Sequence, residues 1–101
     1  MASKASVRTL PIADEDIDAA FAYLFQEAPQ AAADFLDGLE GIEKRLSAFP
    51  RSGSIVQEEP YHRLGYRYVL LMGYYVFYRI EHDNVWILRV LHEKRNYTRL
   101  L

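Results

Sequence analysis

The chain has no cysteine among its 101 residues. This absence excludes a disulfide scaffold, thiolate metal sites and cysteine nucleophiles. Long apolar runs are missing too: the longest uncharged stretch lies between Arg67 and Arg79, and a membrane-spanning helix needs roughly 20 apolar residues. No apolar run follows Lys4, so we expect no signal peptide. These absences predict a soluble, cytoplasmic protein with no membrane segment.

Histidine is scarce as well. The three histidines, His62, His82 and His92, are spaced twenty residues apart, and no pair of carboxylates accompanies them at ligand spacing. Metal binding needs ligands that converge on one point. The sequence also lacks a glycine-rich phosphate loop and a Ser/His/Asp arrangement with a nucleophile turn. We therefore expect neither a metal site nor a cofactor.

What the chain does contain is typical of one globular domain, residues 1–101. Half of the residues are hydrophobic and 26% are charged, which argues against disorder. The net charge of −2 hides an asymmetry, because carboxylates dominate up to residue 60 and cations dominate after it. Seven of the eight tyrosines and the only tryptophan also follow residue 60. This pattern indicates either a working surface near the C-terminus or only the preference of strands for aromatic residues.

The first half predicts a strand and two helices. Ser6–Ile12 is expected to form a strand that Pro11 confines to an edge or ends. A helix is expected from Asp14 to about Glu27, with acidic side chains crowding its first turn. Pro29 then opens a second helix, and the tight link predicts an antiparallel hairpin. Its apolar face is formed by Ala32, Phe35, Leu39, Ile42, Leu46 and Phe49.

From Ser54 onward the periodicity changes to two. Ser54–Gln57 is a short candidate strand, and three longer runs follow it, separated by hairpin-length turns: Tyr66–Met72, Tyr74–Glu81 and Val85–His92. In the last run, strict alternation places Trp86, Leu88 and Val90 opposite Val85, Ile87, Arg89 and Leu91. Because both faces are largely apolar, we expect the helical hairpin on one and another segment on the other. The predicted fold is α+β, with an N-terminal edge strand and an antiparallel two-helix hairpin packed on a three- to four-stranded antiparallel sheet.

Three segments carry a resemblance to a known family: Phe49–Gly53 (FPRSG), Tyr74–Ile80 (YYVFYRI) and Asp83–Arg95 (DNVWILRVLHEKR). Together, in this order and spacing, they resemble the RelE/ParE toxins of type II toxin–antitoxin modules, over about residues 6–99. The ParE-like branch, known from plasmid stabilisation systems, is the better match. The resemblance implies a growth-inhibiting toxin that a cognate antitoxin neutralises.

The resemblance leaves two targets open, since RelE-like members cut mRNA in the ribosomal A site and ParE-like members poison DNA gyrase. RNA cleavage needs a base, an acid and cations for the developing phosphorane charge. The central-strand positions that are basic in RelE-type ribonucleases fall near Tyr66, Tyr68 and Tyr75, which carry no positive charge at pH 7. Arg67 is adjacent, but one step along a strand points to the other face. The ribonuclease set is therefore incomplete.

The residues expected to contact the target lie near the C-terminus: Arg89, His92, Arg95 and Tyr97. If the chain is a ribonuclease, Arg95, His92 and Tyr97 are its catalytic residues. Each also has a structural alternative: a strand-end hydrogen bond for His92, packing on the sheet for Tyr97 and a solvated charge for Arg95. A mid-strand arginine favours a structural role; Arg79 is expected to pair with a helix carboxylate such as Asp37 or Glu40, and Arg89 is a similar case.

The first hypothesis is thus a ParE-like gyrase poison that acts by binding, not by catalysis. Its partner is a ParD-like antitoxin whose disordered segment folds on the toxin in a hetero-oligomer, and Leu24 and Phe25 are candidates for that contact. The second is a RelE-like endoribonuclease acting on mRNA at the ribosome, against which an isoelectric point of 5.9 counts modestly. The third is a non-toxic homologue that only binds antitoxin.

Overall fold

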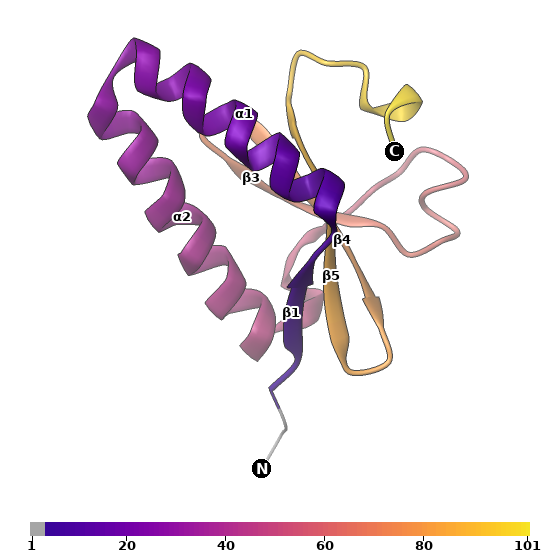
Figure 1. Ribbon diagram of the computed structural model, residues 1–101. Coiled ribbons are helices and arrows are strands. Elements are labelled where there is room, and N and C mark those ends of the chain that lie inside the picture. Colours follow the sequence, from indigo (N-terminus) through magenta and orange to yellow (C-terminus); the bar gives the residue numbers. More distant parts are fainter. Residues whose placement is uncertain (1–3) are drawn as a thin grey trace.

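The computed structural model describes residues 4–101 as one sheet with two long helices (Figure 1). In chain order, its elements are β1 (Ser6–Thr9), α1 (Pro11–Glu27), α2 (Pro29–Ala48), the 3-10 turn η1 (Pro50–Ser52), β2 (Ser54–Ile55), β3 (Arg67–Leu71), β4 (Tyr74–Glu81), β5 (Asn84–His92) and the 3-10 turn η2 (Tyr97–Arg99). The α+β class and the N-terminal edge strand are as predicted.

The sheet has five strands in the order β1-β5-β4-β3-β2. Strands β2 to β5 pair antiparallel, whereas β1 pairs parallel with β5, from Ser6 opposite Asn84 to Thr9 opposite Ile87. The sheet is therefore mixed, and the prediction of a purely antiparallel sheet was wrong on this point. A strand pattern fixes which residues share a face but not the direction of the neighbouring strand.

Helices α1 and α2 form the expected antiparallel hairpin, joined by the single extended residue Ala28. Helix α1 begins at Pro11, three residues before the predicted start, because a proline ring presets a helical φ and lacks the N–H that a first turn leaves unpaired. Leu10 is the N-cap residue of α1, and no side chain makes a capping hydrogen bond there. Neither helix within residues 4–101 combines the length and apolar character required to cross a membrane.

The helical hairpin covers one face of the sheet and forms the main core there. Phe35 of α2 packs edge-on against Tyr74 of β4, with ring centroids 5.3 Å apart. Further along β4, the hydroxyl of the buried Tyr78 donates to the carbonyl of Pro50 (2.7 Å) and accepts from the backbone N–H of Gly53 (2.9 Å). Burial raises the pKa of Tyr78. These bonds fix the η1 turn against the sheet.

The opposite face of the sheet is also covered, as expected from the apolar residues on both of its faces. The segment between β2 and β3 and the C-terminal residues close over it, and η2 lies beside that segment in Figure 1. The fully buried members are Val56, Phe77 and Leu91. Around them pack Tyr61, Tyr66, Tyr68, Tyr75, Tyr97, Leu100 and Leu101. This second cluster is thus rich in tyrosine, whereas the main core is mainly aliphatic.

A β-bulge interrupts β5. Phe77 lies opposite Arg89 and the next residue, Tyr78, lies opposite Ile87, so Leu88 is an extra residue. Val90 therefore shares the helix-facing side with Ile87. The strict alternation predicted for the last strand placed Val90 and Ile87 on different faces of the sheet, and this prediction was wrong beyond the bulge.

Two glycines provide a matched test of the packing. A Cβ on Gly53 would lie 2.5 Å from the Tyr78 hydroxyl and 2.9 Å from the Tyr68 carbonyl, whereas one on the helical Gly41 would meet nothing within 4 Å. We expect Gly53→Ala to lower the free energy of unfolding by about 1–3 kcal/mol. Gly41→Ala should raise it by roughly 0.5–1 kcal/mol. Urea denaturation measures both, and equal midpoints would contradict the packing described around Gly53.

Candidate functional site

The tyrosines that occupy the ribonuclease-like positions lie on one face of the sheet, away from the helices. Tyr68 of β3 and Tyr75 of β4 contact each other nearly at right angles, with centroids 5.1 Å apart. Tyr66 lies on the same side of the sheet. Arg67 turns to the other side, where its Nη1 donates to the carbonyls of Arg51 (3.1 Å) and Gly53 (3.0 Å). The sequence prediction that Arg67 lies outside this site is confirmed.

A small pocket opens among these tyrosines, with a volume of about 60 Å³. It is lined by Ile55, Gln57, Glu58, Tyr68, Tyr75, Phe77 and Tyr97. Over residues 4–101, Glu58 is the only charged residue in that lining. The Tyr97 hydroxyl donates to the Glu58 carboxylate, and burial, followed by this contact, raises the pKa of Tyr97 well above its usual value. The pocket thus offers aromatic rings and a negative charge.

Arg79 does not pair with Asp37 or Glu40, so that expectation was wrong. Its position in β4 places it on the face opposite the helices, where its guanidinium carbon lies 5.9 Å from the centre of the Tyr66 ring. The Arg79 Nε is buried and has no hydrogen-bond partner within residues 4–101. Its surroundings are aromatic rather than acidic.

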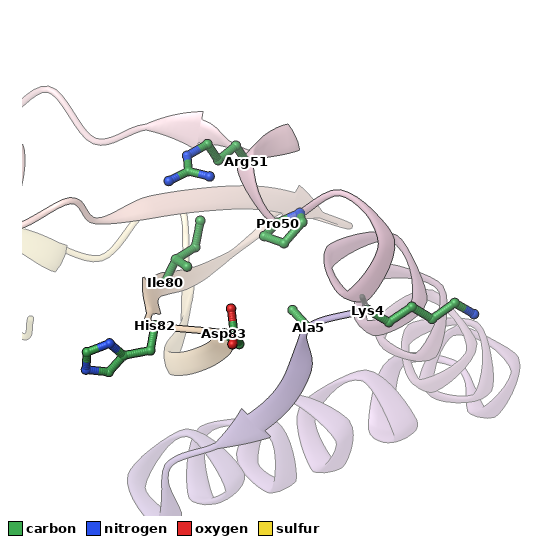
Figure 2. Close-up of a pocket in the computed structure, with 7 residues that line it drawn as sticks. All are labelled: Lys4, Ala5, Pro50, Arg51, Ile80, His82 and Asp83. Carbon is green, nitrogen blue, oxygen red and sulfur yellow. The ribbon is translucent and has the colours of Figure 1, made fainter. Parts of the chain in front are cut away.

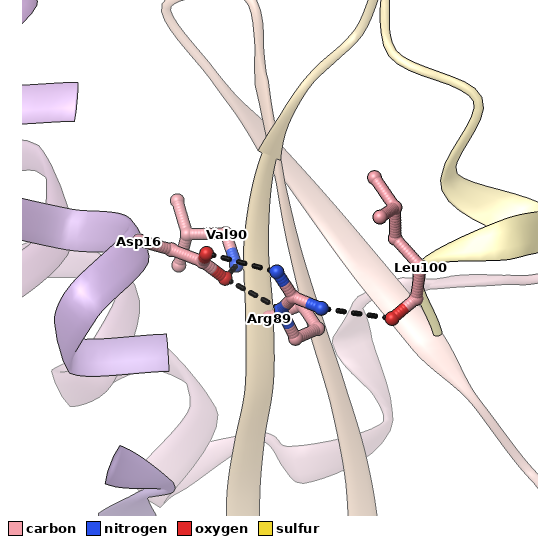
Figure 3. Close-up of polar contacts among 4 residues, drawn as sticks. All are labelled: Asp16, Arg89, Val90 and Leu100. Carbon is pink, nitrogen blue, oxygen red and sulfur yellow. Dashed lines mark hydrogen bonds and ion pairs between the residues drawn. The ribbon is translucent and has the colours of Figure 1, made fainter. Parts of the chain in front are cut away.

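Arg89, in contrast, is held in a nearly buried ion pair with Asp16 of α1 (Figure 3). Its Nε and Nη2 reach the two Asp16 oxygens at 2.7 and 3.0 Å, and the two side chains are 15% and 12% exposed. The hydrogen bonds to Asp16 raise the pKa of Arg89. The third nitrogen, Nη1, donates to the carbonyl of Leu100 at 2.8 Å. Arg89 therefore joins α1 to the C-terminal segment.

The same carboxylate completes the edge of the sheet. Strand β1 ends at Thr9, opposite Ile87, so on its β1 side β5 has no neighbouring strand at Val90, which pairs only with Val76 of β4 on the other side. The Val90 N–H instead donates to Asp16 at 3.0 Å. An unpaired backbone donor at a partly buried edge is costly, so the carboxylate replaces the missing strand. Asp16 was not predicted as a functional residue, because it is one of several neighbouring acids near the start of α1.

His92 and Arg95 line one groove beyond the end of β5. The groove has a volume of about 380 Å³ and is lined by Tyr23, Tyr74, His92, Lys94 and Arg95. The His92 ring packs edge-on against Tyr74 at 5.1 Å, and its Nδ1 accepts from the Lys94 N–H at 3.2 Å. Arg95 also borders two adjoining hollows, one beside Asp16 and one beside Arg99.

The predicted contact residues are therefore separated. His92 and Arg95 share the groove, Arg89 is engaged by Asp16, and Tyr97 lines the aromatic pocket. The proposed ribonuclease set of Arg95, His92 and Tyr97 is accordingly divided between two cavities.

The two residues predicted to contact an antitoxin differ in exposure. Leu24 is partly buried and packs against the main core. Phe25 is 51% exposed and stacks on Phe21, with ring centroids 5.9 Å apart. Tyr23, at the rim of the groove, is 57% exposed. Helix α1 thus presents aromatic rings to solvent near the groove.

Another hollow lies between the start of β1 and the β4–β5 turn, and its side chains do not form a catalytic or metal-binding group. It is lined by Lys4, Ala5, Pro50, Arg51, Ile80, His82 and Asp83. Figure 2 shows the side chains of Lys4 and His82 extending away from the other lining residues. Within the described residues, 4–101, no three His, Asp or Glu side chains come close enough to hold a metal ion.

The Asp16–Arg89 pair generates a stability prediction. Asp16→Ala leaves the Arg89 guanidinium and the Val90 N–H without their acceptor, so we expect a loss of about 2–4 kcal/mol in the free energy of unfolding. Lys44→Ala, which removes the solvent-exposed ion pair with Glu40, should change it by less than about 0.5 kcal/mol. In a double-mutant cycle with Arg89→Ala, the two losses should be clearly less than additive. Additive losses in denaturant unfolding would contradict the coupling.

Comparisons with known proteins agree with this fold. A family model for the ParE toxin of the type II toxin–antitoxin system parDE matches residues 7–97. Among solved structures, a chain of the chromosomal ParDE system from P. aeruginosa has 21% identity and a TM-score of 0.68, covering 90% of this chain and 98% of its own. A chain of the RelBE2 toxin–antitoxin complex from Mycobacterium tuberculosis has 26% identity and a TM-score of 0.61, covering 91% and 94%. No curated protein sequence matches significantly. The chain belongs to the ParE family of toxins from type II toxin–antitoxin systems.

Proposed function

We propose that this toxin stops growth in the cytoplasm by binding DNA gyrase, not by cutting RNA. The observation that carries the proposal is the composition of the aromatic pocket. A ribonuclease must neutralise charge that develops on a pentacoordinate phosphate. Here the pocket contains Tyr68, Tyr75 and Tyr97, and its charged side chain is the carboxylate of Glu58, which repels a phosphate.

The surface that we assign to the target is the groove around Arg95. Lys94 and Arg95 contribute positive charge to its lining, beside the rings of His92 and Tyr74. Neither Lys94 nor Arg95 has a carboxylate within ion-pair distance among residues 4–101. Exposed, unpaired cations beside aromatic rings are suited to binding a protein surface, because arginine and tyrosine contribute disproportionately to interface energies. Arg89 and Tyr97 then act indirectly, by holding the C-terminal segment in place.

A cognate antitoxin is the second proposed partner. The two similar structures come from toxin–antitoxin complexes, which supports a hetero-oligomer here. Phe25 leaves about half of its side chain in solvent and stacks on Phe21, one turn earlier in α1, and the neighbouring Leu24 is partly buried against the main core. A segment that folds on this side of the helix would bury the Phe25 ring, and such coupled folding needs a large apolar contact to offset its ordering cost.

The gyrase proposal predicts direct inhibition in a purified system. Toxin added to gyrase and relaxed plasmid should block supercoiling, and Arg95→Ala should raise the concentration required by about tenfold or more, the effect of removing one strong contact. Lys44→Ala, a remote exposed cation, is the matched control and should change nothing. If gyrase still supercoils the plasmid at a high concentration of the unmodified toxin, gyrase is not the target.

The endoribonuclease alternative makes a different prediction in cells. After induction without antitoxin, pulse-labelling should show DNA synthesis failing before protein synthesis. If translation stops first and mRNA is cut, the divided set of Arg95, His92 and Tyr97 suffices for catalysis and the proposal is wrong. A chain that stops neither process is a non-toxic, antitoxin-binding homologue.

The antitoxin contact can be tested separately. We expect Phe25→Ala to weaken binding of the cognate antitoxin by roughly 1–3 kcal/mol, since the ring would be buried in the complex. Its effect on the stability of the free toxin should be small because half of the ring faces solvent. Calorimetric titration measures the affinity, with Phe49→Ala as control for another exposed phenylalanine. Equal affinities of the Phe25 variant and the parent would remove Phe25 from the interface.

A further inference from the structure

We propose that the aromatic pocket is a recognition site for a positively charged side chain, specifically an arginine presented by a protein partner. This function is distinct from target inhibition, and it follows from three features of the pocket: its ring geometry, its charge and its size. It does not depend on whether gyrase is the target.

The rings are arranged as adjoining walls. Tyr68 and Tyr75 meet at 85°, and Tyr75 and Tyr97 meet at 67° with centroids 5.5 Å apart. Phe77 lies behind them, 4.9 Å from the Tyr97 ring. The faces of aromatic rings carry partial negative charge and attract cations, and enclosures of several rings are used to hold alkylammonium or guanidinium groups. The walls come from β3, β4 and η2, so the enclosure exists only in the folded chain.

The charge of the pocket also favours a bound cation. The Glu58 carboxylate is at the rim and is oriented by the Tyr97 hydroxyl. No arginine or lysine of residues 4–101 forms an ion pair with Glu58 or lies over Tyr68, Tyr75 or Tyr97; the two cation–π contacts found there use Trp86 and Tyr66. The site therefore offers a carboxylate and ring faces that the chain's own cations leave free.

The size of the pocket and its fixed walls favour a guanidinium head group. At about 60 Å³, the pocket matches a small planar head group. The η2 wall is held by the Tyr61 hydroxyl, which donates to the Thr98 carbonyl at 2.7 Å, and by Arg89, which donates to Leu100. A planar guanidinium can stack flat on a ring while two of its in-plane N–H groups donate to a carboxylate, whereas an ammonium is a point charge with neither a plane to stack nor a two-point donor fork. This distinction selects arginine over lysine.

The test titrates the folded toxin with ethylguanidinium, the head group of arginine, at constant ionic strength. Aromatic carbon–proton NMR should show saturable shifts at Tyr68, Tyr75 and Tyr97 but not at Tyr23, which is exposed elsewhere. Butylammonium should bind more weakly. Uridine monophosphate should not bind at these residues; tighter binding of this nucleotide than of ethylguanidinium would overturn the proposal.

Variants separate the site from a general charge effect. Glu58→Gln keeps an acceptor for Tyr97 and removes the charge, so it should weaken ethylguanidinium binding by roughly two- to fivefold, as for one exposed charge pair. Glu59→Gln is the matched control, since its carboxylate is next in sequence but contacts His62, and it should bind as the parent does. Tyr75→Leu should abolish the shifts, with the backbone amide spectrum reporting that the fold is kept. Equal binding by the parent and the Glu58 variant, or no saturable shift in the parent, would refute the assignment.

Discussion

The fold of this toxin depends on the hydrogen bonds made by the part of β5 that extends beyond its parallel neighbour β1. Strand β1 has four residues and β5 has nine, so the backbone of β5 continues past its parallel neighbour. Asp16 accepts hydrogen bonds from both the Val90 N–H, which has no strand partner, and the Arg89 guanidinium, and Arg89 in turn donates to the carbonyl of Leu100. One carboxylate thus fixes three things relative to each other: the start of α1, the bulged half of β5 and the end of the chain.

The Asp16–Arg89 connection explains why the groove and the aromatic pocket lie where they do. On one side of it, α1 and the residues after β5 enclose the groove around Arg95. On the other side, the C-terminal segment folds back and Tyr97 closes the aromatic pocket. Because Arg89 bonds to both α1 and the C-terminal segment, a change in the position of either element alters both cavities. The groove is cationic and the pocket carries a carboxylate, so neighbouring surfaces of one small domain suit partners of opposite charge.

Most of the fold could be predicted because periodicity reports which residues are buried. The apolar face from Ala32 to Leu46 and the alternation in β4 predicted α2 and the central strand. Local patterns do not report strand direction or an inserted residue, so the parallel β1 and the bulge at Leu88 were not predictable. The same limit applies to the site: Asp16 and Arg89 are 73 residues apart in sequence, and no local signal distinguishes Asp16 from the acids around it. Arg79 was misassigned to a helix carboxylate although its alternation with Tyr78 places it on the far face.

The division of the C-terminal residues between two cavities also bears on mechanism. Catalytic cleavage needs an acid, a base and a charge stabiliser within reach of a single phosphate, and rate falls steeply when one is misplaced by about 1 Å. Binding has no such requirement, because separate contacts contribute wherever each meets the partner. His92 and Arg95 border one cavity and Tyr97 the other, with the Glu58 carboxylate beside Tyr97. A surface built in this way is poorly suited to one reacting phosphate and well suited to an extended protein partner, which is the physical reason for preferring a toxin that acts by binding.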